Sequence, residues 1–64
     1  MTLTIKNSVR GTIETYECYD MTVVPTAHFD MHYYTTFEGL VFVVHSYFGA
    51  VYDTRENYIG GIVK

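Results

Sequence analysis

The sequence predicts an all-β fold, a small antiparallel sheet of about five strands with little or no helix. Apolar and polar side chains alternate at a spacing of two, which is the period of a strand with one buried face. The same segments are rich in β-branched and aromatic residues, and no window keeps a helical period. A compact sandwich and a barrel both fit this pattern, and we expect residues 1–64 to form one domain.

The first half of the chain predicts an opening hairpin. Residues 2–6 alternate threonine and lysine with Leu3 and Ile5, a turn follows around 7–11, and residues 12–19 form the returning strand. Residues 20–27 are less regular, and Pro25 marks an edge or a break because it cannot donate a hydrogen bond to a neighbouring strand. A short strand over 21–24 is expected here, and a short helix over 20–27 is the main alternative.

The second half begins with the clearest period of two, over residues 28–37. Glu38 and Gly39 then predict a turn, and residues 40–48 predict the returning strand. Residues 50–54 continue that strand or form another, and 55–57 indicate a turn. A last strand is expected over 58–63, interrupted by Gly60 and Gly61.

A two-residue turn at Glu38 and Gly39 fixes the expected register of the central hairpin. Phe37 then lies opposite Leu40, and the face that carries Phe37 is predicted to be the core. The same register places Tyr34 opposite Val43 and brings the polar residues together on the other face.

The three histidines of the chain fall on that second face. In the expected register His32 lies opposite His45. His28 lies on the same side of the strand as His32, with Asp30 between them. Imidazole and carboxylate groups suit zinc or a related transition metal, so His28, His32 and His45 form a candidate metal site. The alternative is that they line the solvated face of a strand, since the chain lacks the spacings of a strong zinc motif.

Seven tyrosines in 64 residues exceed what one small core can bury with every hydroxyl satisfied. Tyrosine is favoured at protein interfaces because it contributes contact area and a hydrogen bond at low entropic cost. Valines on the same face argue that the face is covered, either by a partner or by the opening hairpin of the chain itself. The predicted partner-binding residues are Tyr34, Val41, Val43 and Tyr47.

Charge and motifs exclude several classes of function. Seven acidic residues against four scattered basic ones give a net charge of −3, which argues against nucleic-acid binding. No nucleophile is paired with an evident base, and Ser46 and His45 point to opposite sides of a strand. We therefore expect no enzymatic activity and no cofactor.

The chain carries no signal of export or membrane insertion. The N-terminal residues contain no apolar run of signal-peptide length, and the longest apolar stretch, 40–44, is too short to span a bilayer. A single cysteine, Cys18, excludes an internal disulfide and fits a reducing compartment. A soluble, cytoplasmic protein with no membrane partner is expected.

Taken together, the sequence predicts a small protein-binding module, a regulator or inhibitor that occludes a larger protein. A second copy of the chain is a further expected partner, which would make the protein a homodimer. Accessory proteins of viruses and mobile elements often have such a profile. The alternatives are a metal-binding module built on the histidines and a structural subunit of a larger assembly.

Overall fold

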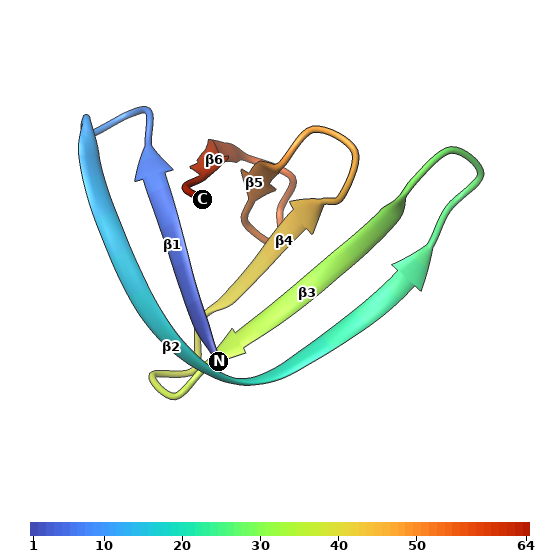
Figure 1. The fold of residues 1–64 in the computed structure, drawn as a ribbon, viewed down its shortest axis with the longest axis horizontal. Helices are drawn as coiled ribbons and strands as arrows, with labels where there is room; N and C mark the ends of the chain where they lie inside the picture. Colours follow the sequence, from blue (N-terminus) through green and yellow to red (C-terminus); the bar gives the residue numbers. More distant parts are fainter.

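The computed structural model describes residues 1–64 as a closed antiparallel barrel of six strands, which confirms the all-β prediction (Figure 1). Each strand pairs with the next along the chain, and the last strand pairs with the first. The strands are β1 (Thr2–Asn7), β2 (Thr12–Pro25), β3 (Asp30–Thr36), β4 (Val41–His45), β5 (Ala50–Tyr52) and β6 (Tyr58–Ile62). No helix in the structure is long and apolar enough to cross a membrane.

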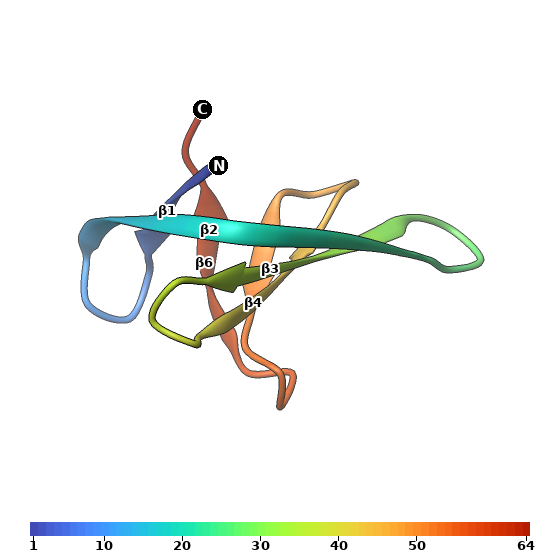
Figure 2. The same cartoon turned by 90° about the horizontal axis from the view of Figure 1, so that it is seen from below.

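The longest strand, β2, pairs with two neighbouring strands. Its first part pairs with β1 through residues 12–17, and its second part pairs with β3 through Pro25. Tyr19 is an extra residue in the ladder, because Cys18 pairs with Thr36 and Asp20 already pairs with Thr35. The bulge bends the strand, so the β2–β3 hairpin reaches away from the other strands (Figures 1 and 2). The separate short strand expected over 21–24 is therefore part of β2, and the alternative helix does not form.

The interior of the barrel is small: only ten of the 64 residues are buried, and one of these, Val43, lies on the outer face. Tyr16 packs on Phe42 with ring centroids 4.7 Å apart, and Tyr34 also packs on the core. The buried cluster consists of Leu3, Ile5, Cys18, Phe42, Val44 and Val51.

The turn between β3 and β4 contains three residues, 37–39, and the expected two-residue turn is wrong. The Thr36 amide donates to the carbonyl of Leu40 at 2.8 Å, and the Thr36 carbonyl accepts from the Gly39 amide at 3.0 Å. The Leu40 amide donates to the hydroxyl of Thr36 at 3.0 Å. Gly39 has φ +89°, a conformation that glycine adopts without a steric penalty and that three-residue hairpin turns require.

The extra turn residue shifts the pairing by one and reverses the predicted faces of β3. Tyr33, instead of Tyr34, lies opposite Val43, and His32 lies opposite Val44. Thr36 is 1% exposed inside the barrel, whereas Phe37, which was predicted to lie in the core, is 72% exposed. A period of two shows that a strand has two different faces, but the turn decides which of them is buried.

Barrel closure depends on a close approach between β6 and β1. Asn7 pairs with Gly60, and the Ser8 amide donates to the carbonyl of Ile59 at 2.9 Å. A β-carbon on Gly60 would lie 1.8 Å from the carbonyl oxygen of Lys6, so no larger residue fits. The two glycines do not interrupt the last strand as expected, and Gly60 allows β6 to run along β1.

These adjacent glycines give a matched pair of variants. Gly60→Ala is expected to destabilise the protein by more than about 3 kcal/mol or to prevent folding, because backbone atoms must move. Gly61→Ala should stay within about 0.5 kcal/mol of wild type, since its β-carbon would meet only the Gly49 carbonyl at 3.8 Å. Urea unfolding followed by circular dichroism measures both. Equal stability of the two variants would contradict the proposed role of Gly60 in closure.

Candidate binding groove

The outer surface of β3, β4 and β5 carries a second layer of packed side chains. Tyr33, Val43 and Tyr52 are cross-strand partners in one row, so they share a face. Val43 is only 4% exposed, yet it does not belong to the interior cluster. Side chains on the outside of the barrel therefore cover it. We call this surface the outer groove.

Aromatic rings follow one another along the outer groove. The ring of Phe29 lies 4.9 Å from that of His45, and His45 stacks on Tyr52 with centroids 4.5 Å apart. Tyr52 in turn packs against Tyr58 in an edge-to-face arrangement, with centroids 5.6 Å apart. Tilted and edge-on contacts of this kind are favourable because of the quadrupoles of the rings. The chain of contacts holds Tyr52 in place from both sides.

The outer groove contains an open pocket of about 330 Å³ beside the β5–β6 loop. Val43 and His45 lie on its central strand, with tyrosines on the two flanking strands. The loop contributes polar groups on one side. The lining residues are Met31, Tyr33, Val43, His45, Tyr52, Asp53, Thr54 and Glu56.

Asp53 shapes the loop that borders this pocket. Its carboxylate accepts hydrogen bonds from the amide of Arg55 at 2.8 Å and from the amide of Asn57 at 2.9 Å. The side chain of Asn57 donates a third at 3.0 Å. The hydrogen bonds from Asn57 contribute most to holding the pKa of Asp53 below its usual range, so this carboxylate is ionised at neutral pH.

Glu56 borders the pocket in an unusual backbone conformation. It is the only residue other than glycine with a positive φ, 66°, a region that costs a residue with a β-carbon on the order of 1 kcal/mol. Its carboxylate forms no hydrogen bond or ion pair within the chain. Glu56 therefore presents an unpaired negative charge beside the pocket.

A second, smaller hollow of about 280 Å³ lies near the β4–β5 loop. His32 and Lys64 are among its lining residues. Tyr47 and Phe48 border it and touch each other edge-on, with centroids 4.9 Å apart. They are 76% and 71% exposed, so this loop presents two aromatic rings to solvent.

The predicted partner-binding residues do not form one surface. Tyr34 packs on the interior cluster, where the opening hairpin contributes Tyr16 to the same core. Val41 and Val43 lie on the outer side of β4, and Tyr47 lies in the exposed β4–β5 loop. Of the four, Val43 alone lines the pocket in the outer groove.

The structure does not bring the three histidines together. His32 shares the inner face with Val44, while His45 is paired with Met31 on the outer face. His28 is exposed in the β2–β3 loop. No group of three or more histidine, cysteine or acidic side chains is arranged to hold a metal ion. The expected pairing of His32 with His45 is wrong because it depended on the two-residue turn.

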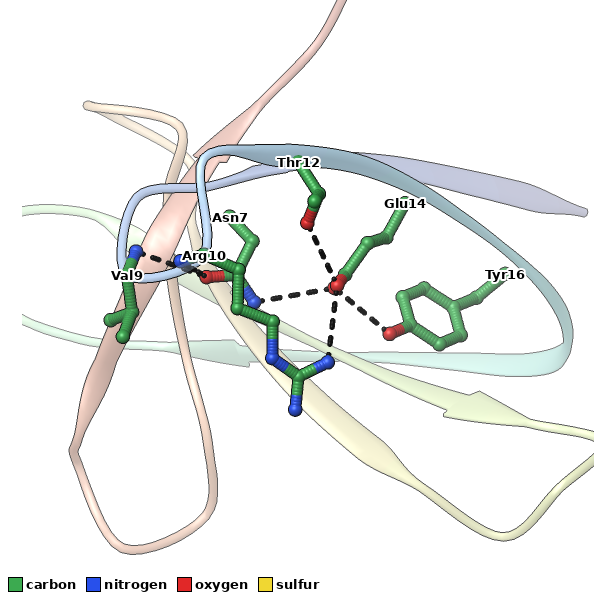
Figure 3. Close-up of polar contacts among 6 residues, drawn as sticks. All are labelled: Asn7, Val9, Arg10, Thr12, Glu14 and Tyr16. Carbon is green, nitrogen blue, oxygen red and sulfur yellow. Dashed lines mark hydrogen bonds and ion pairs between the residues drawn. The ribbon is translucent and has the colours of Figure 1, made fainter.

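The main polar network of the chain lies beside the β1–β2 turn (Figure 3). The carboxylate of Glu14 accepts from Tyr16 at 3.0 Å, from Thr12 at 3.1 Å, from Asn7 at 3.3 Å and from Nη1 of Arg10 at 3.4 Å. The side-chain oxygen of Asn7 accepts the backbone amides of residues 9 and 10 at 3.0 Å. The network joins the turn to both strands, and its donors and acceptors are mutually satisfied, as befits a structural role.

The network changes how its members titrate. The hydrogen bond from Asn7 is the largest influence lowering the pKa of Glu14. Burial raises the pKa of the Tyr16 hydroxyl, and its hydrogen bond to Glu14 adds to the effect. Burial likewise raises the pKa of the Cys18 thiol. Ionised Glu14 and neutral Tyr16 and Cys18 are therefore the forms that the fold favours.

These shifts predict a loss of stability in acid. Because the native pKa values of Glu14 and Asp53 lie below their unfolded values, the unfolded chain takes up protons first. The free energy of unfolding should fall as pH drops from the ordinary carboxyl value of about 4 through the native values. Thermal unfolding against pH measures this, and Glu14→Gln should show a shallower decline than wild type. An unchanged decline would contradict the role assigned to the Glu14 network.

Stability should also fall at alkaline pH, because two native pKa values are raised and not lowered. The native pKa values of Tyr16 and Cys18 are raised, so the folded chain holds its protons longer than the unfolded chain. The stabilisation that comes from these raised pKa values is fully present below the ordinary pKa values of the unfolded chain, about 8.5 for cysteine and about 10 for tyrosine. It disappears as pH rises through the native values. The same thermal series in Cys18→Ala should begin its alkaline decline at higher pH; an identical onset would contradict the assignment to Cys18.

The different positions of two tyrosines can be tested by truncation. Tyr34→Ala should cost about 2–4 kcal/mol, since it removes a ring packed on the interior cluster. Tyr47→Ala should change stability by less than about 0.5 kcal/mol, because its ring is 76% exposed. Chemical denaturation compares them. A stable Tyr34 variant would show that this ring is dispensable to the core.

Comparison with known proteins supplies no relative. No family model matches the chain, and no curated protein or solved structure matches it significantly.

Sequence reasoning missed the residues that complete this groove. The sequence pattern predicts only that Tyr52 lies in a continued or separate strand, Glu56 in a turn and Tyr58 in the last strand. The signal available was an acidic turn bracketed by tyrosines at 52 and 58. It became meaningful only when the register placed Tyr33 and Tyr52 on either side of Val43.

Proposed function

We propose that this protein is a small binding module that occludes a larger protein in the cytoplasm and acts as its regulator or inhibitor. The observation that carries the proposal is the aromatic outer groove, a concave surface in which Tyr33 and Tyr52 flank a buried Val43. Concave sites lined by aromatic side chains with a few polar groups are the usual form of a ligand pocket, and such a pocket can accept a side chain of a protein partner. Tyrosine is also among the residues that contribute most to binding energy at interfaces.

The surface around the groove supports the same function. Outside the groove, several large apolar side chains are well exposed, including Phe37 at 72% in the β3–β4 turn and Phe48 at 71% beside the second hollow. Exposed apolar area of this extent on so small a chain favours burial against a partner. Barrel closure pairs β1 with β6, but the part of β2 beyond Cys18 pairs only with β3, so its other edge is free and can also contact a partner.

The proposal is tested with one groove variant and one control. Tyr52→Ser removes the central ring of the groove, whereas Ile13→Ser changes a side chain that is 63% exposed and lines neither hollow. Tagged wild type and both variants are used to capture partners from the source cells, after circular dichroism has shown that each variant is folded. The captured protein is then purified and titrated by calorimetry.

We expect a partner that wild type and Ile13→Ser bind alike and that Tyr52→Ser binds at least about tenfold more weakly, as for a residue that dominates an interface. A second copy of the chain is an acceptable partner, and light scattering would then show a dimer that Tyr52→Ser dissociates. A partner that binds Tyr52→Ser as tightly as wild type would contradict the assignment of the groove.

A further inference from the structure

We propose that the pocket in the outer groove binds the guanidinium group of an arginine side chain on the protein partner. This inference rests on the proposed function and adds the chemistry that the groove recognises. Its basis is the combination of aromatic faces, unpaired negative charge and the absence of any lysine or arginine among the lining residues.

The charged residues that line the pocket are negative. Arg55 belongs to the same loop and interacts electrostatically with Asp53, but it does not line the pocket. Asp53 and Glu56 both line it, and the chain carries a net charge of −3. Asp53 already accepts three hydrogen bonds from the loop, so its carboxylate has less capacity for a new donor than that of Glu56. Glu56 has no partner within the chain and is the acceptor available to a cation.

The conformation of Glu56 is consistent with a selected role. A positive φ of 66° is normally taken by glycine or asparagine, and both would serve the loop better than glutamate does. A residue kept in an unfavourable conformation beside a pocket is a reason to look for a function of its side chain. Here that function is an ionic contact with the partner.

The aromatic walls favour arginine over other cations. Tyr33 and Tyr52 lie on the strands either side of Val43. His45 already stacks on one face of Tyr52 at 4.5 Å, whereas Tyr33 lines the pocket without an aromatic neighbour and is the ring available for stacking. A planar guanidinium stacks on aromatic faces while its edge donates hydrogen bonds to a carboxylate, whereas an ammonium group cannot stack in this way. The pocket volume of about 330 Å³ is at the lower end for ligand sites, which suits one side chain.

The test is a nuclear magnetic resonance titration of the whole 15N-labelled protein with three short peptides. Acetyl-Gly-Arg-Gly-amide carries the proposed group. The citrulline analogue has nearly the same shape without the charge, and the lysine analogue has the charge without the plane. Glu56→Gln removes the proposed acceptor, and Glu38→Gln removes an exposed carboxylate in the β3–β4 turn as a matched control.

We expect the arginine peptide to shift amide resonances of the pocket residues, with binding at least about fivefold weaker for the citrulline and lysine peptides. Glu56→Gln should weaken arginine binding by about fivefold or more, while Glu38→Gln binds as wild type. The inference would be overturned if the citrulline peptide caused equal shifts or the lysine peptide bound as tightly or more tightly. It would also be overturned if the arginine peptide shifted only resonances away from the pocket or did not bind.

The two proposals fail separately. If the arginine peptide does not bind but Tyr52→Ser still releases a protein partner, the groove is a protein-binding surface that does not select arginine. If the arginine peptide binds as expected, the pocket chemistry is established whichever protein supplies the side chain.

Discussion

The turn that joins β3 to β4 decides which surface of this molecule meets solvent. Thr36 is buried and holds the turn through its amide, carbonyl and hydroxyl, while Gly39 adopts the left-handed conformation that a third turn residue requires. The resulting register places Tyr34 inside the barrel and Tyr33 outside it. With one residue fewer, β3 would present its other face, and neither the core nor the groove would exist in its present form.

The outer groove is a consequence of this register combined with closure. Pairing of β4 with β5 adds Tyr52 to the row that contains Tyr33 and Val43. Gly60 allows β6 to approach β1 closely enough to complete the barrel, and the β5–β6 loop then brings Glu56 beside the rings. The aromatic surface thus depends on the register of β3, β4 and β5, whereas the negative charge depends on the position of the β5–β6 loop.

The sequence was sufficient for the fold class and for most strands, because a period of two and β-branched residues report local geometry directly. It was not sufficient for the faces of β3. A polar Thr36 in the core and an exposed Phe37 oppose the hydrophobic pattern, and only the hydrogen bonds of the turn explain them. The histidine cluster failed for the same reason, since a shift of one residue sends His32 and His45 to opposite faces.

The most direct test of this account is the pattern of nuclear Overhauser effects between α-protons across β3 and β4. Non-hydrogen-bonded antiparallel pairs bring their α-carbons within about 4.5 Å and give strong cross-peaks. The register described above predicts such a cross-peak between Tyr33 and Val43, which are cross-strand partners. A cross-peak between His32 and His45 would contradict it, because it would show the two-residue turn and place these two histidines on one face.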